Sequence, residues 1–472
     1  MCGPLRNNIL RAGALCGLTL LIAASPAAVG SDPSANLPSL FPLTNQDRIL
    51  VLAPHEDDEA LGTGGLLQQA ISAGAAVRIV YLTYGDHNEL AFLLYRKRPW
   101  LTPHINQNMG EVRRREAINA MTHLGISPNH LVFLGYPDGG VLEIWKQHWG
   151  ESPPLRSRST HTLRVPYKDS FSYNKPHKGE AVVADIEQQL MEFRPTHIFV
   201  TQPVDGHPDH RACALFLQVA LLNLAQQIPP AKVYLYPIHI GTWPHPFGFH
   251  PNKWLAVPKQ LGGDGSTWWT LPLTPQQVHR KARAIHFYRS QMVDASFWMN
   301  AFARRNELFT TPRLEFLHSD RWGSGNPAMA HPETAAYDGE TKTMRVTGAE
   351  YLSSEDVLLV RLVLRQPIDP QLGLSLYLFG YRKDQPFGTM PKLRIDWGLG
   401  RLRVRDQGIV VPNAPVHAQS NQKEVTLLIP WNLMGEPNTL FVQAEGLVSG
   451  LAVAQTGWET VSRSSANNPV AP

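Results

Sequence analysis

The stretch ILVLAPHEDDEA, residues 49–60, decides the fold and indicates the chemistry of this chain. Its first five residues, 49–53, form a continuous apolar run, which is typical of a β-strand that is buried on both faces. Apolar residues then recur at helical spacing from Glu59 to Ala73. A buried strand followed by a helix is the repeating unit of a parallel α/β sheet. The polar residues between them therefore lie at the carboxyl end of the strand, where such sheets bind ligands.

The same alternation continues along the chain. Further apolar runs predict strands at 77–82, 131–134, 197–200 and 233–236, and amphipathic stretches predict helices at 111–124, 179–193 and 210–226. This order is typical of an α/β fold with a Rossmann-like, mostly parallel sheet and helices on both of its faces.

After about residue 320 the helical periodicity stops and short alternating runs begin. They lie at 357–364, 374–379, 393–397, 401–405, 425–429 and 440–442. These runs predict a C-terminal antiparallel β-sandwich over 333–465, joined to the first domain by a linker at 324–332 that is rich in Gly, Pro and Ala. The stretch IPWNLMG at 429–435 faintly resembles carbohydrate-binding sandwich modules, although we expect Trp431 to be a core residue.

The composition excludes several classes of protein. Of 472 residues, 43% are hydrophobic and 17% are charged, with a net charge of +4, which argues against a disordered chain and against a dedicated nucleic-acid binder. Three cysteines are too few for a disulfide scaffold or a Cys-rich zinc module. Nineteen histidines leave metal chemistry based on histidine and carboxylate open.

The N-terminal residues 1–30 have the features of a secretory signal peptide. Arg6 and Arg11 precede an apolar run at 12–24, which is followed by small residues. This run is too short to span a membrane, and the bulky Leu15 argues against lipidation of Cys16. We therefore expect cleavage near residue 30, a linker at 31–46, no membrane span in the mature chain, and a periplasmic or secreted protein.

Two clusters of histidine and carboxylate follow predicted strands and open predicted helices: HEDDE at 55–59 and DGHPDH at 205–210. A catalytic zinc ion takes three nitrogen or oxygen ligands from the protein and keeps one position open. His55 and Asp58 can converge on one point, and His210 can arrive from the neighbouring loop. Asp57 is then the candidate base for proton transfer.

A simpler interpretation stays open for each residue. Asp57, Asp58 or Glu59 could cap the following helix, and one histidine at a strand end is more often a structural group than a ligand. Two such clusters at equivalent strand ends favour a metal site.

The motifs APHEDDE at 53–59, with glycines at 62, 64 and 65, and GHPDH at 206–210 resemble those of the LmbE-like, or PIG-L, family of N-acetylglucosaminyl de-N-acetylases. The resemblance extends over about 47–310, and we place the domain at 47–323. It implies that Zn2+, or another divalent transition metal, is bound by His55, Asp58 and His210. It also implies that Asp57 is the general base and that His207 stabilises charge on a tetrahedral intermediate.

The resemblance extends to two substrate-binding positions. Arg113 and Asp138 match positions that contact the substrate sugar in the family. Arg113 could instead be a solvated charge on a helix face, and Asp138 a turn residue in a Pro-Asp-Gly sequence.

The chain departs from the family pattern at two positions. Glu56 stands where the family usually has proline, and we expect its side chain to point outward and not to bind metal. Asp205 stands where some members have a tyrosine that donates to the oxyanion. An ionised acid cannot donate, so the second oxyanion donor stays open.

Three long segments favour a large substrate. They are 139–178 with Trp145 and Trp149, the aromatic-rich stretch 243–269, and 90–103. A connection as long as the first is usually either functional or disordered. The second could be a glycan platform or could anchor a loop against the core, and the third could form another wall or a solvated basic turn.

These features together predict an exported zinc-dependent deacetylase that hydrolyses the N-acetyl group of an N-acetylhexosamine in a polysaccharide or glycoconjugate. One alternative is a deacylase of another N-acyl amide, such as a small amino-sugar conjugate or an acylated antibiotic. A non-enzymatic alternative is a glycan-binding protein with an inactive deacetylase fold. The expected partner is an N-acetylated glycan or amino sugar, and the oligomeric state stays open.

Overall fold

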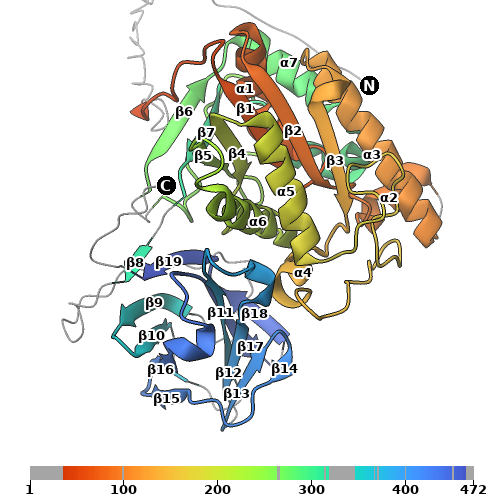
Figure 1. Cartoon of the computed structure of the whole chain (residues 1–472). Helices are drawn as coiled ribbons and strands as arrows, with labels where there is room; N and C mark the ends of the chain where they lie inside the picture. Colours follow the sequence, from red (N-terminus) through yellow and green to blue (C-terminus); the bar gives the residue numbers. More distant parts are fainter. Residues whose placement is uncertain are drawn as a thin grey trace, which may run out of the picture.

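A computed structural model describes residues 36–97, 100–262, 266–312, 315–317, 346–365, 367–368, 372–398, 400–448 and 451–463. The expected signal peptide, the linker at 324–332, and the first residues of the linker at 31–46 lie outside these ranges. Figure 1 shows an α/β domain stacked on a smaller β domain, which confirms the predicted fold class. Within the described residues, no helix combines the length and the apolar character that crossing a bilayer requires.

The α/β domain is built on a seven-stranded sheet with the order β3-β2-β1-β4-β5-β7-β6. Its strands are β1 (Arg48–Ala53), β2 (Ala76–Thr83), β3 (Leu131–Tyr136), β4 (His197–Thr201), β5 (Lys232–Tyr236), β6 (Trp268–Pro272) and β7 (Asn306–Thr310). The first five in this order run parallel, and β7 pairs antiparallel with β5 and β6. Because the chain moves from β1 first to β2 and later to β4, the loops after β1 and β4 meet at the switch point of the sheet, where such folds bind ligands.

Helices cover this sheet (Figure 1). They are α1 (Asp58–Ser72), α2 (Glu89–Arg96), α3 (Pro103–His123), α4 (Val141–Gln147), α5 (Gly179–Phe193), α6 (Pro208–Leu224), α7 (Pro275–Ile285) and α8 (Arg289–Asn300). Helix α3 begins eight residues before the predicted start. Thr102 caps it by accepting a hydrogen bond from the Ile105 N–H, and proline suits the first turn, but the polar residues that follow hide the helical period.

The C-terminal domain consists of two sheets that pack as a sandwich, and their strands pair antiparallel except at one edge of the larger sheet. One has the order β15-β16-β10-β9, and the other has β14-β13-β12-β11-β17-β19-β8 with β18 beside β17. The strands are β8 (Glu315–Leu317), β9 (Val346–Ser353), β10 (Val357–Leu364), β11 (Leu372–Tyr381), β12 (Lys392–Gly398), β13 (Arg401–Asp406), β14 (Ile409–Val410), β15 (His417–Ser420), β16 (Glu424–Pro430), β17 (Thr439–Val448), β18 (Leu451–Gln455) and β19 (Glu459–Arg463). Burial alternates residue by residue along β10, and Trp431 lies in the core as expected.

The two domains share one apolar core. Trp145 of α4 is fully buried, and its ring contacts those of Phe379, Phe387, Phe441 and Trp458 from the sandwich. Trp149 is buried with it. The sandwich covers the segment that carries these two tryptophans, so they are core residues and do not form a substrate surface.

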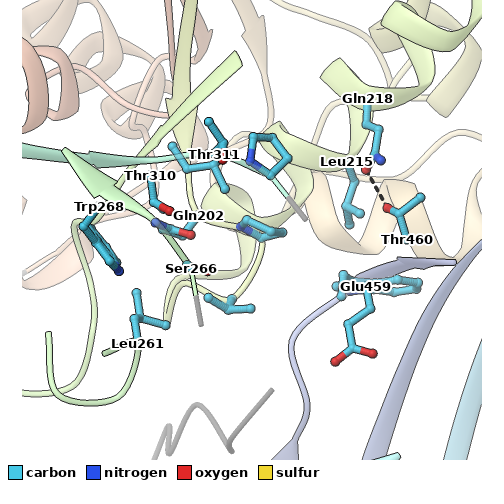
Figure 2. A pocket seen from close by; sticks show the side chains of 15 residues that line it. Gln202, Leu215, Gln218, Leu261, Ser266, Trp268, Thr310, Thr311, Glu459 and Thr460 are labelled. Atoms are coloured by element: carbon cyan, nitrogen blue, oxygen red, sulfur yellow. Dashed lines mark hydrogen bonds between the residues drawn. The ribbon is translucent and has the colours of Figure 1, made fainter. Parts of the chain in front are cut away.

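A small cavity of about 60 Å³ lies at this interface (Figure 2). Thr460 of the sandwich donates to Gln218 of α6 over 2.8 Å, and a Cβ on Gly457 would lie 2.1 Å from Val204. The cavity has room for a few water molecules. The sandwich therefore packs directly behind the loop that leads from β4 to the second motif.

Candidate active site

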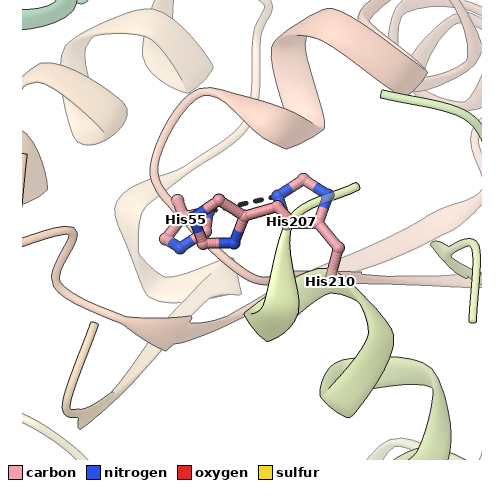
Figure 3. Close-up of side chains that lie close together, drawn as sticks. All are labelled: His55, His207 and His210. Carbon is pink, nitrogen blue, oxygen red and sulfur yellow. Dashed lines mark hydrogen bonds between the residues drawn. The ribbon is translucent and has the colours of Figure 1, made fainter. Parts of the chain in front are cut away.

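The two motifs meet at the switch point of the sheet. His55 to Asp57 follow β1, and His207 caps the N-terminus of α6 in the loop after β4. Figure 3 shows the imidazoles of His55, His207 and His210 converging on one place. The neighbouring strand ends that the sequence predicted thus bring both clusters into one site.

Three ligand atoms form a tight triangle. His55 Nδ1 lies 3.2 Å from His210 Nε2, and Asp58 Oδ2 lies 3.3 Å and 3.1 Å from these two nitrogens. Ligand atoms around a tetrahedral zinc ion, at bond lengths of about 2.0–2.1 Å, lie about 3.3 Å from each other. The residues present therefore fit a divalent ion in both spacing and donor type.

The charges around this triangle also favour a cation. Burial alone would lower the pKa of His55 and of His210, but neighbouring carboxylates outweigh burial, and the pKa of His210 rises to about 9. The carboxylates responsible are those of Asp58, Asp138, Asp205 and Asp209. An excess of buried negative charge of this kind is stabilised when a metal ion enters.

Other combinations of ligand atoms lie within 4.8 Å of one another, including the set His55, Asp138 and Asp209. This set uses the other ring nitrogen of His55, whose Nε2 lies 3.1 Å from Asp138 and 3.4 Å from Asp209. Both carboxylates are already engaged, since Asp138 accepts from the His87 N–H and Asp209 from the Gly139 and Val141 N–H groups. We assign them to holding the His55 ring, so that Nδ1 faces the triangle. Asp138, expected at the substrate, lies behind His55.

Asp205 holds His210 from the opposite side. Its Oδ2 lies 3.3 Å from His210 Nδ1, and its two oxygens accept hydrogen bonds from the backbone N–H groups of His207 and His239. Burial opposes ionisation of Asp205, but His210 outweighs this effect and lowers the pKa of the carboxyl below its usual range. A carboxylate behind a ligand histidine is a common feature of metal sites, and here it occupies the position of the expected oxyanion donor.

The His207 ring is neutral and its tautomer is fixed. Burial lowers the pKa of His207, and the neighbouring histidines His55, His210 and His239 lower it further. The Asp209 N–H donates to His207 Nδ1 over 3.2 Å, so the proton of the neutral ring is on Nε2. Nε2–H is therefore the hydrogen-bond donor that His207 has available.

Asp57 has the backbone and the surroundings of a functional group. Its φ is 139°, which L residues rarely adopt and which costs about 1–3 kcal/mol. The side chain does not cap α1; instead the Asp57 N–H donates to Glu59 Oε2 over 3.0 Å. Burial raises the pKa of Asp57 to about 7, although Arg113 opposes this change.

Arg113 is buried and its contacts lie within the chain. It donates to Gly85 O over 3.1 Å, to Glu56 O over 2.7 Å and to Asp57 Oδ2 over 3.3 Å. The structure therefore places Arg113 as the group that holds the Asp57 carboxylate, and the alternative of a solvated charge on a helix face is wrong.

Glu56 does not point outward, and that expectation is wrong. Its side chain is fully buried, and Oε2 lies 3.7 Å from Arg113 Nε. Neither carboxyl oxygen has a hydrogen-bond partner in the part of the chain that the structure describes. Glu56 belongs to none of the groups of ligand atoms in the described residues that could hold a metal. Burial raises the pKa of its carboxyl well above the usual range, although Arg113 opposes this change.

Sequence reasoning missed two partners of the site. His239 follows β5, and its ring contacts those of His207 and His210. Tyr288 precedes α8 and donates to the buried Glu59. Neither residue belongs to a motif. His239, however, follows the end of the parallel strand β5, and this position could have marked it as a candidate site residue.

Comparison with known proteins agrees with this geometry. Residues 50–221 match the family model described as GlcNAc-PI de-N-acetylase, PIG-L, so this part of the chain is a PIG-L family domain. A 1D-myo-inositol 2-acetamido-2-deoxy-alpha-D-glucopyranoside deacetylase of Mycobacterium sp. strain KMS is 31% identical over 39% of this chain and 52% of its own length. A protein of the same description from Catenulispora acidiphila is 32% identical over 51% of this chain and 64% of its own.

Among solved structures, the N,N'-diacetylchitobiose deacetylase of Pyrococcus horikoshii is 18% identical to this chain. The match covers 56% of this chain and 83% of the other, with a TM-score of 0.36. The chain spans about half the length of the first curated relatives that it matches.

Proposed function

We propose that this protein is a metal-dependent N-deacetylase that removes the acetyl group of an N-acetylhexosamine unit in a glycan or glycoconjugate. The observation that carries the proposal is the triangle of His55 Nδ1, Asp58 Oδ2 and His210 Nε2. Asp57 directly precedes the ligand Asp58, and Arg113 holds its carboxylate. The PIG-L family match over these motifs supports it. Zinc suits the donor set best, because two imidazoles and one carboxylate are typical ligands of a catalytic zinc ion.

The reaction is the hydrolysis of an acetamide to acetate and a free amine. A divalent ion bound at the triangle would supply Lewis acidity at the reacting carbonyl. Asp57 accepts a proton from the attacking water and later returns a proton to the nitrogen as the C–N bond breaks. A pKa near 7 suits both steps at neutral pH, and Arg113 keeps the carboxylate in place.

His207 stabilises the tetrahedral intermediate. The carbonyl oxygen gains negative charge when water adds, and a neutral imidazole with its proton on Nε2 can donate a hydrogen bond to that oxygen. The Asp209 N–H on Nδ1 fixes this tautomer before substrate binds.

Aromatic side chains near the site support a substrate larger than one sugar. Phe247, Phe249 and Phe297 are 43%, 43% and 76% exposed, and the Gly248 N–H donates to Phe297 O over 2.7 Å. The next residue, Trp298, stacks on His239 beside the metal triangle. Aromatic faces exposed next to a site offer stacking surfaces to the rings of a glycan.

Release of acetate tests the proposal. The zinc-loaded protein should release acetate from at least one of a set of N-acetylated chitooligosaccharides and surface glycans. Asp57→Ala should abolish release while the zinc content stays at one ion per chain, and Asp384→Ala, which changes an exposed acid of the sandwich, should change neither. Full activity of Asp57→Ala, or no release from any substrate by the unaltered protein, contradicts the proposed function.

We also propose that the protein is exported, on the basis of the basic, apolar and small-residue segments of residues 1–30. The N-terminus of the protein isolated from its own cells tests this. A mature chain that begins near residue 31, outside the cytoplasm, is expected. A cytoplasmic chain that begins at Met1 contradicts export and leaves the deacetylase proposal unaffected.

A further inference from the structure

His239 lies beside the metal triangle and belongs to neither motif. Its ring centroid lies 4.8 Å from that of His210 and 5.6 Å from that of His207. One ring nitrogen lies within 4.8 Å of the ligand atoms of Asp58 and His210. The residue is half-buried, whereas Asp58 and His210 are fully buried. His239 is therefore closer to solvent than these two metal ligands are.

The backbone of His239 is tied to the loop of the second motif in both directions. Its N–H donates to Asp205 Oδ2 over 3.0 Å, and its carbonyl accepts from the Gly206 N–H over 2.8 Å. A Cβ on Gly206 would lie 2.7 Å from that carbonyl oxygen, so only glycine permits this approach. Asp205, which positions His210, thus positions His239 as well.

An aromatic side chain stacks on the imidazole ring of His239 and holds it in place. Trp298 of α8 stacks on it with 4.8 Å between centroids and 10° between planes, and the Trp298 indole N–H donates to Trp243 O over 3.3 Å. No ring nitrogen of His239 has a hydrogen-bond partner within the described ranges, although the ring is fixed on several sides. A fixed polar group with unused hydrogen-bonding capacity at a site is suited to contact substrate.

We propose that His239 is a catalytic residue that donates a second hydrogen bond to the acetamide oxygen, together with His207. An imidazole carries at least one N–H in either of its ionisation states, so the donor is available at any pH at which the protein is folded. This inference rests on the proposed function. It assigns an oxyanion donor in place of Asp205, whose two oxygens accept from the backbone N–H groups of His207 and His239 and face His210.

The alternative is that His239 is a fourth metal ligand, and metal affinity separates the two roles. If His239 contacts substrate, His239→Ala should keep its zinc affinity within about threefold of the unaltered protein. The kcat for acetate release should then fall about 100- to 1000-fold with little change in KM. Its affinity for a phosphonamidate analogue of the tetrahedral intermediate should fall in parallel, while affinity for the amine product should not change.

Two further variants complete the experiment. His239→Asn retains an N–H donor and should recover part of the lost kcat. The control His417→Ala, which changes an exposed histidine of β15 in the sandwich, should match the unaltered protein. A His239→Ala variant that retains full kcat, or that loses zinc, overturns the proposal while the proposed function stands. An unaltered protein that is inactive on every N-acetylated substrate overturns both.

Discussion

The indole of Trp458 in the sandwich meets the indole of Trp145 in α4 edge to face, with 5.8 Å between ring centroids and 90° between planes. The exposed fractions of Trp145 and Trp458 are 0% and 2%. Trp458 also donates its backbone N–H to the carbonyl oxygen of Pro203, which lies two residues before Asp205 and four before His207. The sandwich therefore supports the loop that carries the second motif, in addition to extending the core.

Trp458→Ala should destabilise the whole protein. Removing a buried indole from a shared core costs about 3–5 kcal/mol, because the cavity left behind is only partly refilled. Unfolding in urea, followed by fluorescence and circular dichroism, measures the change. Trp100→Ala serves as the control, because Trp100 is 58% exposed. Equal stability of the two variants would contradict a shared core.

Asp205→Asn should weaken metal binding without unfolding the protein. The Asp205 carboxylate faces His210 Nδ1 at 3.3 Å and strengthens its partner as a ligand. Loss of such an outer carboxylate typically costs about 10- to 100-fold in metal affinity. Competition for zinc with a chelating dye measures this, and Asp384→Asn on the sandwich surface is the matched control. Unchanged zinc affinity would show that Asp205 only holds the backbone N–H groups of His207 and His239.

The stability of the protein should rise with pH above neutrality because of Lys392. This side chain is buried at the domain interface, donates to Phe387 O and to Met390 O, and lies 3.8 Å from the Phe387 ring centroid. Burial lowers the pKa of Lys392 to about 7, although Asp406 and Glu180 oppose this change. An unfolded lysine keeps a pKa near 10.4.

Between these two values the unfolded chain binds one more proton than the folded chain, so stability rises as pH rises from about 7 to about 10. The change is of the order of several kcal/mol, and below pH 7 it levels off. Lys392→Met should remove this part of the pH dependence in urea unfolding measured from pH 6 to 10. An unaltered slope in the variant would assign the dependence to other groups.

Much of the fold was predictable because each element has a strong local signal. The apolar runs of β1 and β4 and the alternating burial of β10 follow directly from the residue pattern. The start of α3 was missed because residues 103–110 are polar and their helix depends on the Thr102 cap and on tertiary contacts. The intrinsic helix propensity of these residues has less influence on where the helix begins than the cap and the tertiary contacts have.

The ligand cluster was predictable because motif residues at adjacent parallel strand ends must converge. The residues that surround the ligand cluster were not predictable from the sequence. Glu56 was placed outward because a charged side chain is rarely buried, but Arg113, 57 positions away, lies beside it. His239 and Trp298 come from separate loops and helices, and only the packed structure brings them beside His210. The role of the segment with Trp145 and Trp149 stayed open, because a residue pattern cannot show that the sandwich covers these side chains.

Removal of metal should lower the thermal stability of the unaltered protein. The ligand atoms of His55, Asp58 and His210 lie within 3.3 Å of one another, and further buried carboxylates surround them. A ligand present at about 1,000 times its dissociation constant stabilises the folded state by about 4 kcal/mol. Scanning calorimetry with and without a chelator measures the difference.

His210→Ala should lower stability and also abolish the response to zinc, because the triangle loses one corner. His239→Ala should keep the full response, because His239 contacts substrate and does not bind the ion. A chelator that leaves the melting temperature of the unaltered protein unchanged would mean that the triangle is held by protons and hydrogen bonds alone.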